Sequence, residues 1–214
     1  MFGMALFSCA TQANTREGLY MGGGIATSAD HYELTTKFLG SRAQISDSAH
    51  RNNTLGNLFV GLGYTMAESF FIGGELGTQF PSHSVSIIDR PVLVYGSAVN
   101  DTLKIQDYLT LDLLPGYVID SNFLVYGRLG LAYSSLKLKQ PSTSVLPGLS
   151  HCENVWGGRF GLGVNFAFNN NFAAGLDYYF TNYQDMNFYS TPYHSQFTSS
   201  VYSNFVGLSV IYTV

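Results

Sequence analysis

The stretch that decides the fold is VYSNFVGLSVIYTV, from Val201 to Val214. Large side chains occupy one set of alternate positions, and mostly small or polar ones occupy the other. The first set is Tyr202, Val206, Leu208, Val210, Tyr212 and Val214, interrupted only by Asn204. A period of two residues indicates a β-strand with two unlike faces. The segment therefore predicts a strand that is apolar on one side and largely small or polar on the other.

The same alternation recurs along the chain, in segments about as long as a tilted strand that crosses a bilayer. We predict seven further strands, near 19–27, 57–66, 70–80, 103–119, 123–133, 156–168 and 172–181. Short links of turn-forming residues lie at 67–69, 120–122 and 169–171. Long polar links lie near 28–56, 81–102, 136–155 and 182–200. This layout predicts an all-β fold, an eight-stranded antiparallel up-and-down barrel with four long loops at one end.

Composition favours a barrel in a membrane. Charged residues make up only 11% of the 214 residues, which is less than half the usual share. A soluble barrel with so little charge would be poorly solvated, whereas the lipid face of a membrane barrel needs no charge. No apolar run is long enough for a spanning helix. The net charge of -4 gives no basic footprint for nucleic acid, which we exclude as a partner.

The less apolar face of the predicted strands carries a few charged side chains. They are Glu75, Asp112, Arg128, Arg159 and Asp177. Side chains nearly fill the interior of a barrel this narrow, and charges removed from water need partners. We therefore predict an ion-pair network inside the barrel. The network either only holds the barrel together or gates a narrow pore; an unchanged single-channel conductance after alanine replacement of Arg128 or Arg159 would exclude the gate.

Aromatic residues gather near the ends of the predicted strands. Transmembrane barrels carry such residues in two girdles at the membrane interfaces. We expect a girdle of Tyr64, Phe80, Tyr117, Tyr133, Trp156, Phe168, Phe180 and Tyr212. Aromatic residues are also good strand formers, but their bunching at strand ends favours girdles.

No residue set points to catalysis, and we expect no catalytic residue, no metal and no cofactor. The histidines, His31, His50, His83, His151 and His194, all fall in the long links. None has metal-like spacing with another. The adjacent pairs His83-Ser84 and His194-Ser195 would alternate in direction on a strand, so they do not make a nucleophile–base dyad.

The N-terminal residues 1–13 resemble a signal peptide, because an apolar stretch precedes the small-residue site Thr11-Gln12-Ala13. The positive charges that usually begin such a leader are missing, so the true start can lie further upstream. We expect a single barrel domain over 14–214. Cys9 would be removed with the leader, which would leave Cys152 without a disulfide partner.

Several pieces of the chain together resemble a known family. GLYMGGG at 18–24, GGELG at 73–77, LLPGY at 113–117, YGRLG at 126–130 and the terminal strand are similar to the opacity-type and outer-membrane-protein-A-like eight-stranded barrels of Gram-negative bacteria. The resemblance extends over nearly all of 18–214. It implies a monomer in the outer membrane, with short periplasmic turns and long extracellular loops.

The resemblance also implies partners. The barrel-assembly machinery reads a C-terminal strand, which places an insertion signal at Leu208, Val210, Tyr212 and Val214; Val214 departs from the usual terminal Phe or Trp. Outer-membrane lipid and lipopolysaccharide would surround the barrel. Host-cell surface ligands are further expected partners, because the family includes adhesins whose loops make the contacts.

For function, the sequence and the resemblance favour a non-enzymatic, porin-like surface protein that adheres through its extracellular loops. Two alternatives stay open. One is a narrow pore for ions or small solutes. The other is a lipid-modifying enzyme, because outer-membrane enzymes of that class are also eight-stranded barrels.

Overall fold

The computed structural model describes residues 16–38, 44–66, 69–88, 100–140, 149–190 and 195–214. The predicted leader at 1–13, with Cys9, and the predicted loop residue His194 lie outside these ranges. Among the described residues, no helix is long and apolar enough to cross a membrane.

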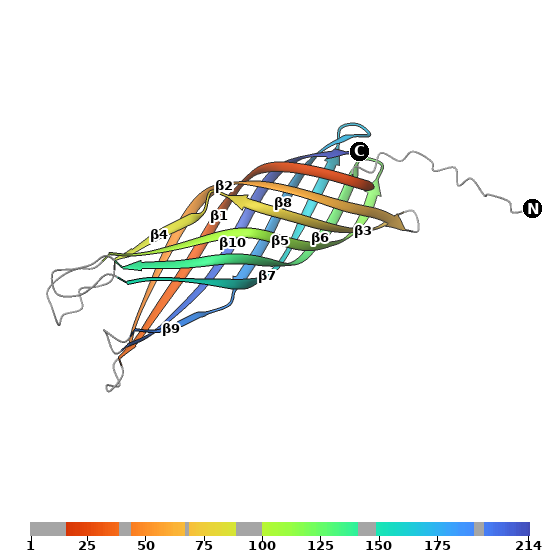
Figure 1. Cartoon of the computed structure of the whole chain (residues 1–214). Coiled ribbons are helices and arrows are strands. Elements are labelled where there is room, and N and C mark those ends of the chain that lie inside the picture. Colours follow the sequence, from red (N-terminus) through yellow and green to blue (C-terminus); the bar gives the residue numbers. More distant parts are fainter. Residues whose placement is uncertain (1–15, 39–43, 67–68, 89–99, 141–148, 191–194) are drawn as a thin grey trace, which may run out of the picture.

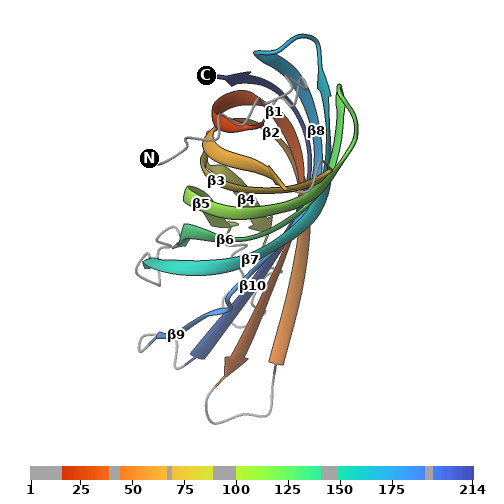
Figure 2. The same ribbon diagram turned by 90° about the vertical axis from the view of Figure 1, so that its right-hand side faces the viewer.

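The described residues form ten strands in one sheet. They are β1 (Gly18–Phe38), β2 (Gln44–Met66), β3 (Phe70–Phe80), β4 (His83–Ile88), β5 (Asn100–Asp120), β6 (Phe123–Gln140), β7 (Leu149–Ala167), β8 (Phe172–Tyr183), β9 (Met186–Ser190) and β10 (Ser195–Thr213). All their pairings are antiparallel, in the order β1-β2-β3-β5-β6-β7-β8-β10, and β10 pairs back with β1. The sheet thus closes into the predicted eight-stranded barrel, whose tilted strands are visible in Figure 1 and Figure 2.

Two of the eight walls of the barrel are interrupted strands. Both β3 and β4 pair with β5, and both β8 and β9 pair with β10. The first interruption falls at Pro81, which has no backbone N–H to donate to a neighbouring strand. Each short strand therefore continues its predecessor toward the long-loop end, and the number of walls remains eight.

Two of the predicted short links, at 120–122 and 169–171, form tight turns, whereas most of the link at 67–69 lies outside the described residues. Asn122 donates its backbone N–H to the Asp120 side chain at 2.8 Å. Asn171 and Phe172 donate theirs to Asn169 Oδ1 at 2.9 and 2.8 Å. These bonds satisfy backbone donors that the ladder leaves free, which is why Asn and Asp suit such turns.

The strands extend much further into the long links than predicted. Most of the described part of 28–56 belongs to β1 and β2, and β6 and β7 extend through much of 136–155. The long links are therefore largely β-hairpins that project beyond the membrane band. Period-two alternation did not predict these strand extensions, because their outward positions are polar and interrupt the row of alternate apolar residues.

One register prediction is wrong. Unbroken period-two alternation over the predicted strand 103–119 puts Leu103 and Ile105 on the lipid face and Lys104 inside. In the structure, Leu103 and Ile105 are buried inside the barrel and Lys104 is exposed. The pairing of β5 with β6 shifts between Asp107 and Leu109. A β-bulge adds one residue to one strand, and this reverses the face of every residue beyond it.

Elsewhere the two faces lie as predicted. On β10, Phe205 and Ile211 are fully buried inside the barrel, whereas Val206, Leu208 and Val210 are more than half exposed on its outer surface. Large exposed side chains, such as Leu62 on β2 and Leu162 on β7, continue this apolar band around the barrel. A soluble barrel would carry its apolar face inward, so the outer band requires lipid.

The barrel interior has three layers. Aromatic and aliphatic residues such as Phe71 and Leu114 fill the short-turn end. The charged residues lie in the middle. The long-hairpin end holds a third layer, the outer core, whose buried members include Tyr32, Leu103 and Leu138. This outer core lies mostly within the segments that the sequence predicted to be polar loops.

Candidate functional site in the barrel interior

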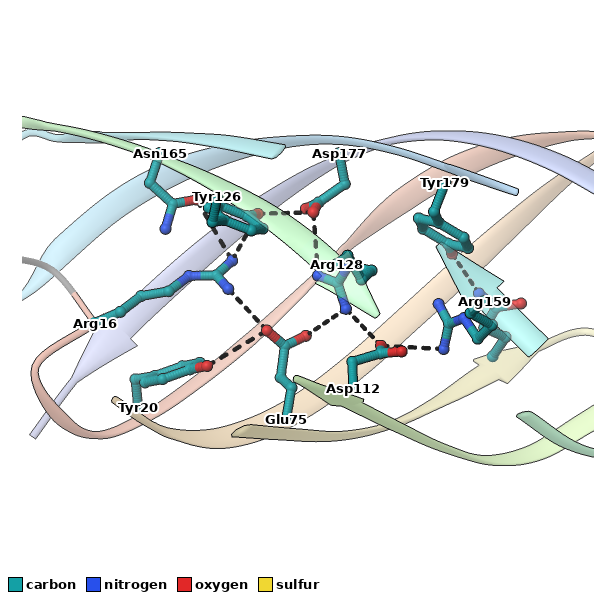
Figure 3. Close-up of polar contacts among 11 residues, drawn as sticks. Arg16, Tyr20, Glu75, Asp112, Tyr126, Arg128, Arg159, Asn165, Asp177 and Tyr179 are labelled. Atoms are coloured by element: carbon teal, nitrogen blue, oxygen red, sulfur yellow. Dashed lines mark hydrogen bonds and ion pairs between the residues drawn. The ribbon is translucent and has the colours of Figure 1, made fainter. Parts of the chain in front are cut away.

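Arg128 lies at the centre of the charged layer. Its Nη1 donates to Asp112 Oδ2 at 2.6 Å and to Glu75 Oε1 at 3.2 Å, and its Nη2 donates to Asp177 Oδ1 at 3.0 Å. Arg159 makes a further ion pair with Asp112 at 3.2 Å. The structure thus brings all five predicted charges together, from β3, β5, β6, β7 and β8 (Figure 3).

The pairing of the strands explains why Arg128 is needed there. Glu75 on β3 lies directly opposite Asp112 on β5, and like charges in that position repel. The guanidinium of Arg128 contacts both carboxylates and has a planar array of donors that can serve several acceptors at once. Arg128 therefore converts a repulsive pair into an attractive cluster.

Arg16 is a sixth charge that the sequence analysis missed. It precedes β1 and is fully buried, and its Nη1 donates to Glu75 Oε2 at 2.8 Å. Its Nη2 donates to the Tyr126 hydroxyl at 3.1 Å, and its Nε donates to the side-chain oxygen of Asn165 at 2.5 Å. The only sequence signal was an arginine just before the first strand, and alternation gives no face to a residue outside a strand.

With Arg16 included, the formal charge of the cluster is balanced. Arg16, Arg128 and Arg159 face the three carboxylates of Glu75, Asp112 and Asp177. We call these six residues the lumen cluster. Five predicted charges alone would leave one excess negative charge in a buried site, which is costly.

Tyrosines complete the lumen cluster. Tyr126 donates its hydroxyl to Asp177 Oδ1 at 2.7 Å, and its ring lies 4.6 Å from the Arg16 guanidinium. Tyr20 donates to Glu75 at 3.4 Å. The Tyr179 ring lies 4.4 Å from the guanidinium of Arg159 (Figure 3). Arginine on an aromatic face is favourable where water is excluded, so these rings stabilise charges that ion pairs alone do not fully surround.

The interior leaves little free space. A cavity of about 20 Å³ lies beside the lumen cluster, between Asp112, Arg128, Arg159 and Tyr179. That volume holds roughly one water molecule. The outer core closes the interior toward the long hairpins, and Phe71 and Leu114 close it toward the short turns.

The predicted girdle residues lie on the outer surface. Tyr64, Phe80, Tyr117, Trp156, Phe168 and Tyr212 are exposed, and Tyr133 and Phe180 are partly exposed. Tyr133 packs on Trp156 with ring centroids 5.0 Å apart. The residues of the expected insertion signal, Leu208, Val210, Tyr212 and Val214, are exposed on the outer face at the C-terminal end.

Two of the histidines are brought together by the β1–β2 hairpin. His31 lies directly opposite His50, with His31 Nδ1 3.0 Å from His50 Nδ1. His31 also stacks on Tyr202, with centroids 4.5 Å apart. Sequence spacing could not reveal this pair, because strand pairing sets it. The described residues contain no group of three or more His, Cys, Asp or Glu side chains that could hold a metal ion.

A closed antiparallel barrel with an apolar outer band and a polar interior is an integral outer-membrane β-barrel. The chain belongs to the family described as the outer membrane protein beta-barrel domain, whose model matches residues 2–212. No curated protein matches the chain. In the outer membrane, the short turns of such a barrel are periplasmic and the long hairpins are extracellular.

Solved structures agree with this fold. The outer membrane protein OprG from Pseudomonas aeruginosa is similar at 17% identity and a TM-score of 0.58, over 94% of this chain and 99% of that one. The outer membrane protease OmpT from Escherichia coli is similar at 9% identity and a TM-score of 0.51, over 94% and 98%. Ail, the attachment invasion locus protein of Yersinia pestis, matches at 13% identity and a TM-score of 0.39, over 91% and 99%. The structural similarity to OprG and OmpT indicates a shared fold, and at these low identities it carries no shared activity.

Proposed function

We propose that this protein is a closed outer-membrane anchor that presents four extracellular β-hairpins for adhesive contact at the cell surface. The observation that carries the proposal is the filled interior. An ion-pair cluster, two apolar layers and a cavity of about 20 Å³ leave the exposed hairpins as the part of the molecule that is free to act.

The extracellular hairpins are paired, rigid extensions of the barrel, which suits them to contact with another surface. β1 and β2 remain paired from the membrane band out to Lys37 and Gln44, and β6 and β7 remain paired out to Gln140 and Leu149. Beneath them, the buried outer core fixes the hairpins to one another. Binding segments on a rigid scaffold lose little conformational entropy when they bind.

Shortening the hairpin tips tests adhesion. Residues 89–99 and 141–148 are each replaced by a two-residue Asn-Gly turn, and bacteria carrying each variant are counted on cultured host cells. Adhesion should fall for at least one variant. A matched control carries Asn170→Ala in the turn at the opposite, periplasmic end. Unchanged adhesion by folded variants would contradict the proposal.

Conductance separates this proposal from a pore. The refolded barrel in a planar lipid bilayer should show no steady single-channel current. A steady current that Arg128→Ala alters would instead support the narrow pore and give the lumen cluster the role of a gate.

A further inference from the structure

Three of the four lysines of this chain lie together on the outer surface of β5 and β6. Lys104 is directly opposite Lys137, and Thr102 is directly opposite Lys139. These residues line one hollow of about 270 Å³, which we call the lysine hollow. The bulge between Asp107 and Leu109 turns Lys104 outward, and without that bulge the lysine would point into the barrel.

The lysine hollow concentrates positive charge that the described protein leaves uncompensated. Like charges directly opposite on neighbouring strands are unfavourable. In the described part of the chain, no carboxylate lies within 4.0 Å of the ammonium group of Lys104, Lys137 or Lys139. An anion between them would relieve the repulsion, and the Thr102 hydroxyl could donate a further hydrogen bond.

The position of the lysine hollow along the barrel axis, relative to the membrane, identifies the anion. Lys137 lies four residues beyond Tyr133 on β6, on the same outer face and toward the extracellular end. Tyr133 and Trp156 pack together at the girdle level. Four residues of strand span roughly 13 Å, and a tilt of about 40° places Lys137 roughly 10 Å above the girdle. That is the headgroup layer of the outer leaflet, outside the hydrocarbon.

We propose that the lysine hollow binds a phosphate group of lipopolysaccharide in the outer leaflet. Lysine is a point charge that suits a phosphate, and a hollow open on the side of the barrel faces a lipid directly. The site is distinct from the hairpin tips, so the inference stands even if the chain is not an adhesin.

Quantitative binding with a matched control tests the proposal. The test variant is Lys104→Gln/Lys137→Gln/Lys139→Gln, and the control is Lys37→Gln, which removes the fourth lysine on β1. Each folded barrel in neutral detergent is titrated with bisphosphorylated lipid A, with dephosphorylated lipid A and with inorganic phosphate. An anionic lipid surface is worth roughly a fivefold change in affinity per lysine, so the triple variant should bind bisphosphorylated lipid A roughly a hundredfold more weakly. The control should change less than about twofold.

The three ligands distinguish the sources of the anion. The lipid assignment requires that dephosphorylated lipid A bind the wild-type barrel much more weakly and that inorganic phosphate compete only poorly. If inorganic phosphate binds as tightly as lipid A, the site takes free phosphate and the lipid assignment fails. In a fourth titration, heparin should bind more weakly than bisphosphorylated lipid A. If heparin binds more tightly and this binding is lost in the triple variant, the ligand is a sulfated polysaccharide and the lipid assignment fails. Equal binding by the triple variant and the wild type would overturn the site itself.

Discussion

At the scale of single residues, the charged layer shows how buried charges, which are costly to remove from water, can favour one strand register over the others. Removing both partners of a buried ion pair can be nearly neutral, whereas removing one leaves a charge without compensation. Arg128 contacts three carboxylates at 2.6–3.2 Å, so it is the residue whose loss leaves the most charge uncompensated. Such a cluster also penalises any strand register that would separate its members.

Replacement of Arg128 by methionine should therefore destabilise the barrel strongly. Loss of one partner of a buried pair costs about 3–5 kcal/mol, and methionine keeps most of the side-chain volume. Urea unfolding in lipid vesicles, followed by fluorescence of the single tryptophan Trp156, gives the free energy of unfolding. The control Arg51→Met, at an exposed position of β2, should change it by less than about 0.5 kcal/mol. Equal stability of the Arg128 variant and the wild type would show that the ion pairs contribute nothing.

His31 gives a prediction about pH. It lies in the extracellular part of β1, where partial burial lowers the pKa of its imidazole; the facing His50 lowers the pKa further and Glu33 opposes the shift. Because its pKa is lowered, His31 binds a proton less readily in the folded protein than in the unfolded chain. Stability should therefore fall as the pH drops through the ordinary pKa of histidine toward the lower folded value.

An NMR titration of histidine-labelled barrel in micelles measures this shift. His31 should titrate below an ordinary histidine, and His50→Gln should raise its pKa by removing the repulsion. The control His151→Gln on β7 removes a histidine that does not face His31 or His50, and it should leave the pKa of His31 unchanged. An ordinary pKa for His31 in the wild type would contradict the close contact with His50.

At the scale of elements, glycines decide whether the strands can surround their large interior side chains. Gly163 on β7 faces the lumen, and a Cβ there would collide with the Tyr126 ring and lie 2.6 Å from Asp177 Oδ1. Tyr126 cannot easily move aside, because it is hydrogen-bonded to Arg16 and Asp177. The same strand contains Gly158, where a Cβ would meet nothing within 4 Å.

Gly163→Ala should destabilise the barrel by about 1–3 kcal/mol, as overpacking of a tight core does. Gly158→Ala in the same strand should be within about 0.5 kcal/mol of the wild type. The same tryptophan-detected unfolding compares the two alanine variants directly. If they unfold alike, the interior around Tyr126 is looser than the structure indicates.

The element scale also shows what the sequence could reveal. Period-two alternation predicted the number of walls and the faces of most strands, because lipid outside and tight packing inside impose opposite compositions. It failed at Leu103 and Ile105, since a bulge shifts the register without any local sequence signal. It also failed at the hairpin extensions, where water replaces lipid outside and apolar residues such as Leu136 and Leu138 pack inside.

The candidate site was predictable to a similar degree. Five of its charges lie on strands, where alternation places them on one face, and a closed barrel then requires them to meet. Arg16 precedes the first strand and could be assigned only from its position in space. The His31–His50 pair and the lysine hollow depend on strand register, which one sequence does not determine.

At the scale of the whole molecule, closure of the sheet is the property on which everything else depends. β1 and β10 pair along nearly their full lengths, from Tyr20 with Thr213 to Phe38 with Ser195. The described strands therefore leave no unpaired edge in the membrane, where unsatisfied backbone groups cost several kcal/mol each. Detergent must therefore break many hydrogen bonds together before the barrel opens.

This closure predicts heat-modifiable migration on an SDS gel. The unboiled folded protein should migrate differently from the boiled protein, because the closed barrel resists SDS until it is heated. Ser209→Pro should abolish the folded, unboiled band. Ser209 pairs with Gly24 on β1 and with Gly175 on β8. Proline has no backbone N–H, so in a central strand it removes a hydrogen bond to the neighbouring strand. The control Ser121→Pro lies in an exposed turn, where proline is well tolerated, and should migrate like the wild type. Identical migration before and after boiling, in a protein that stays soluble without detergent, would reverse the assignment of the two faces and indicate a soluble barrel.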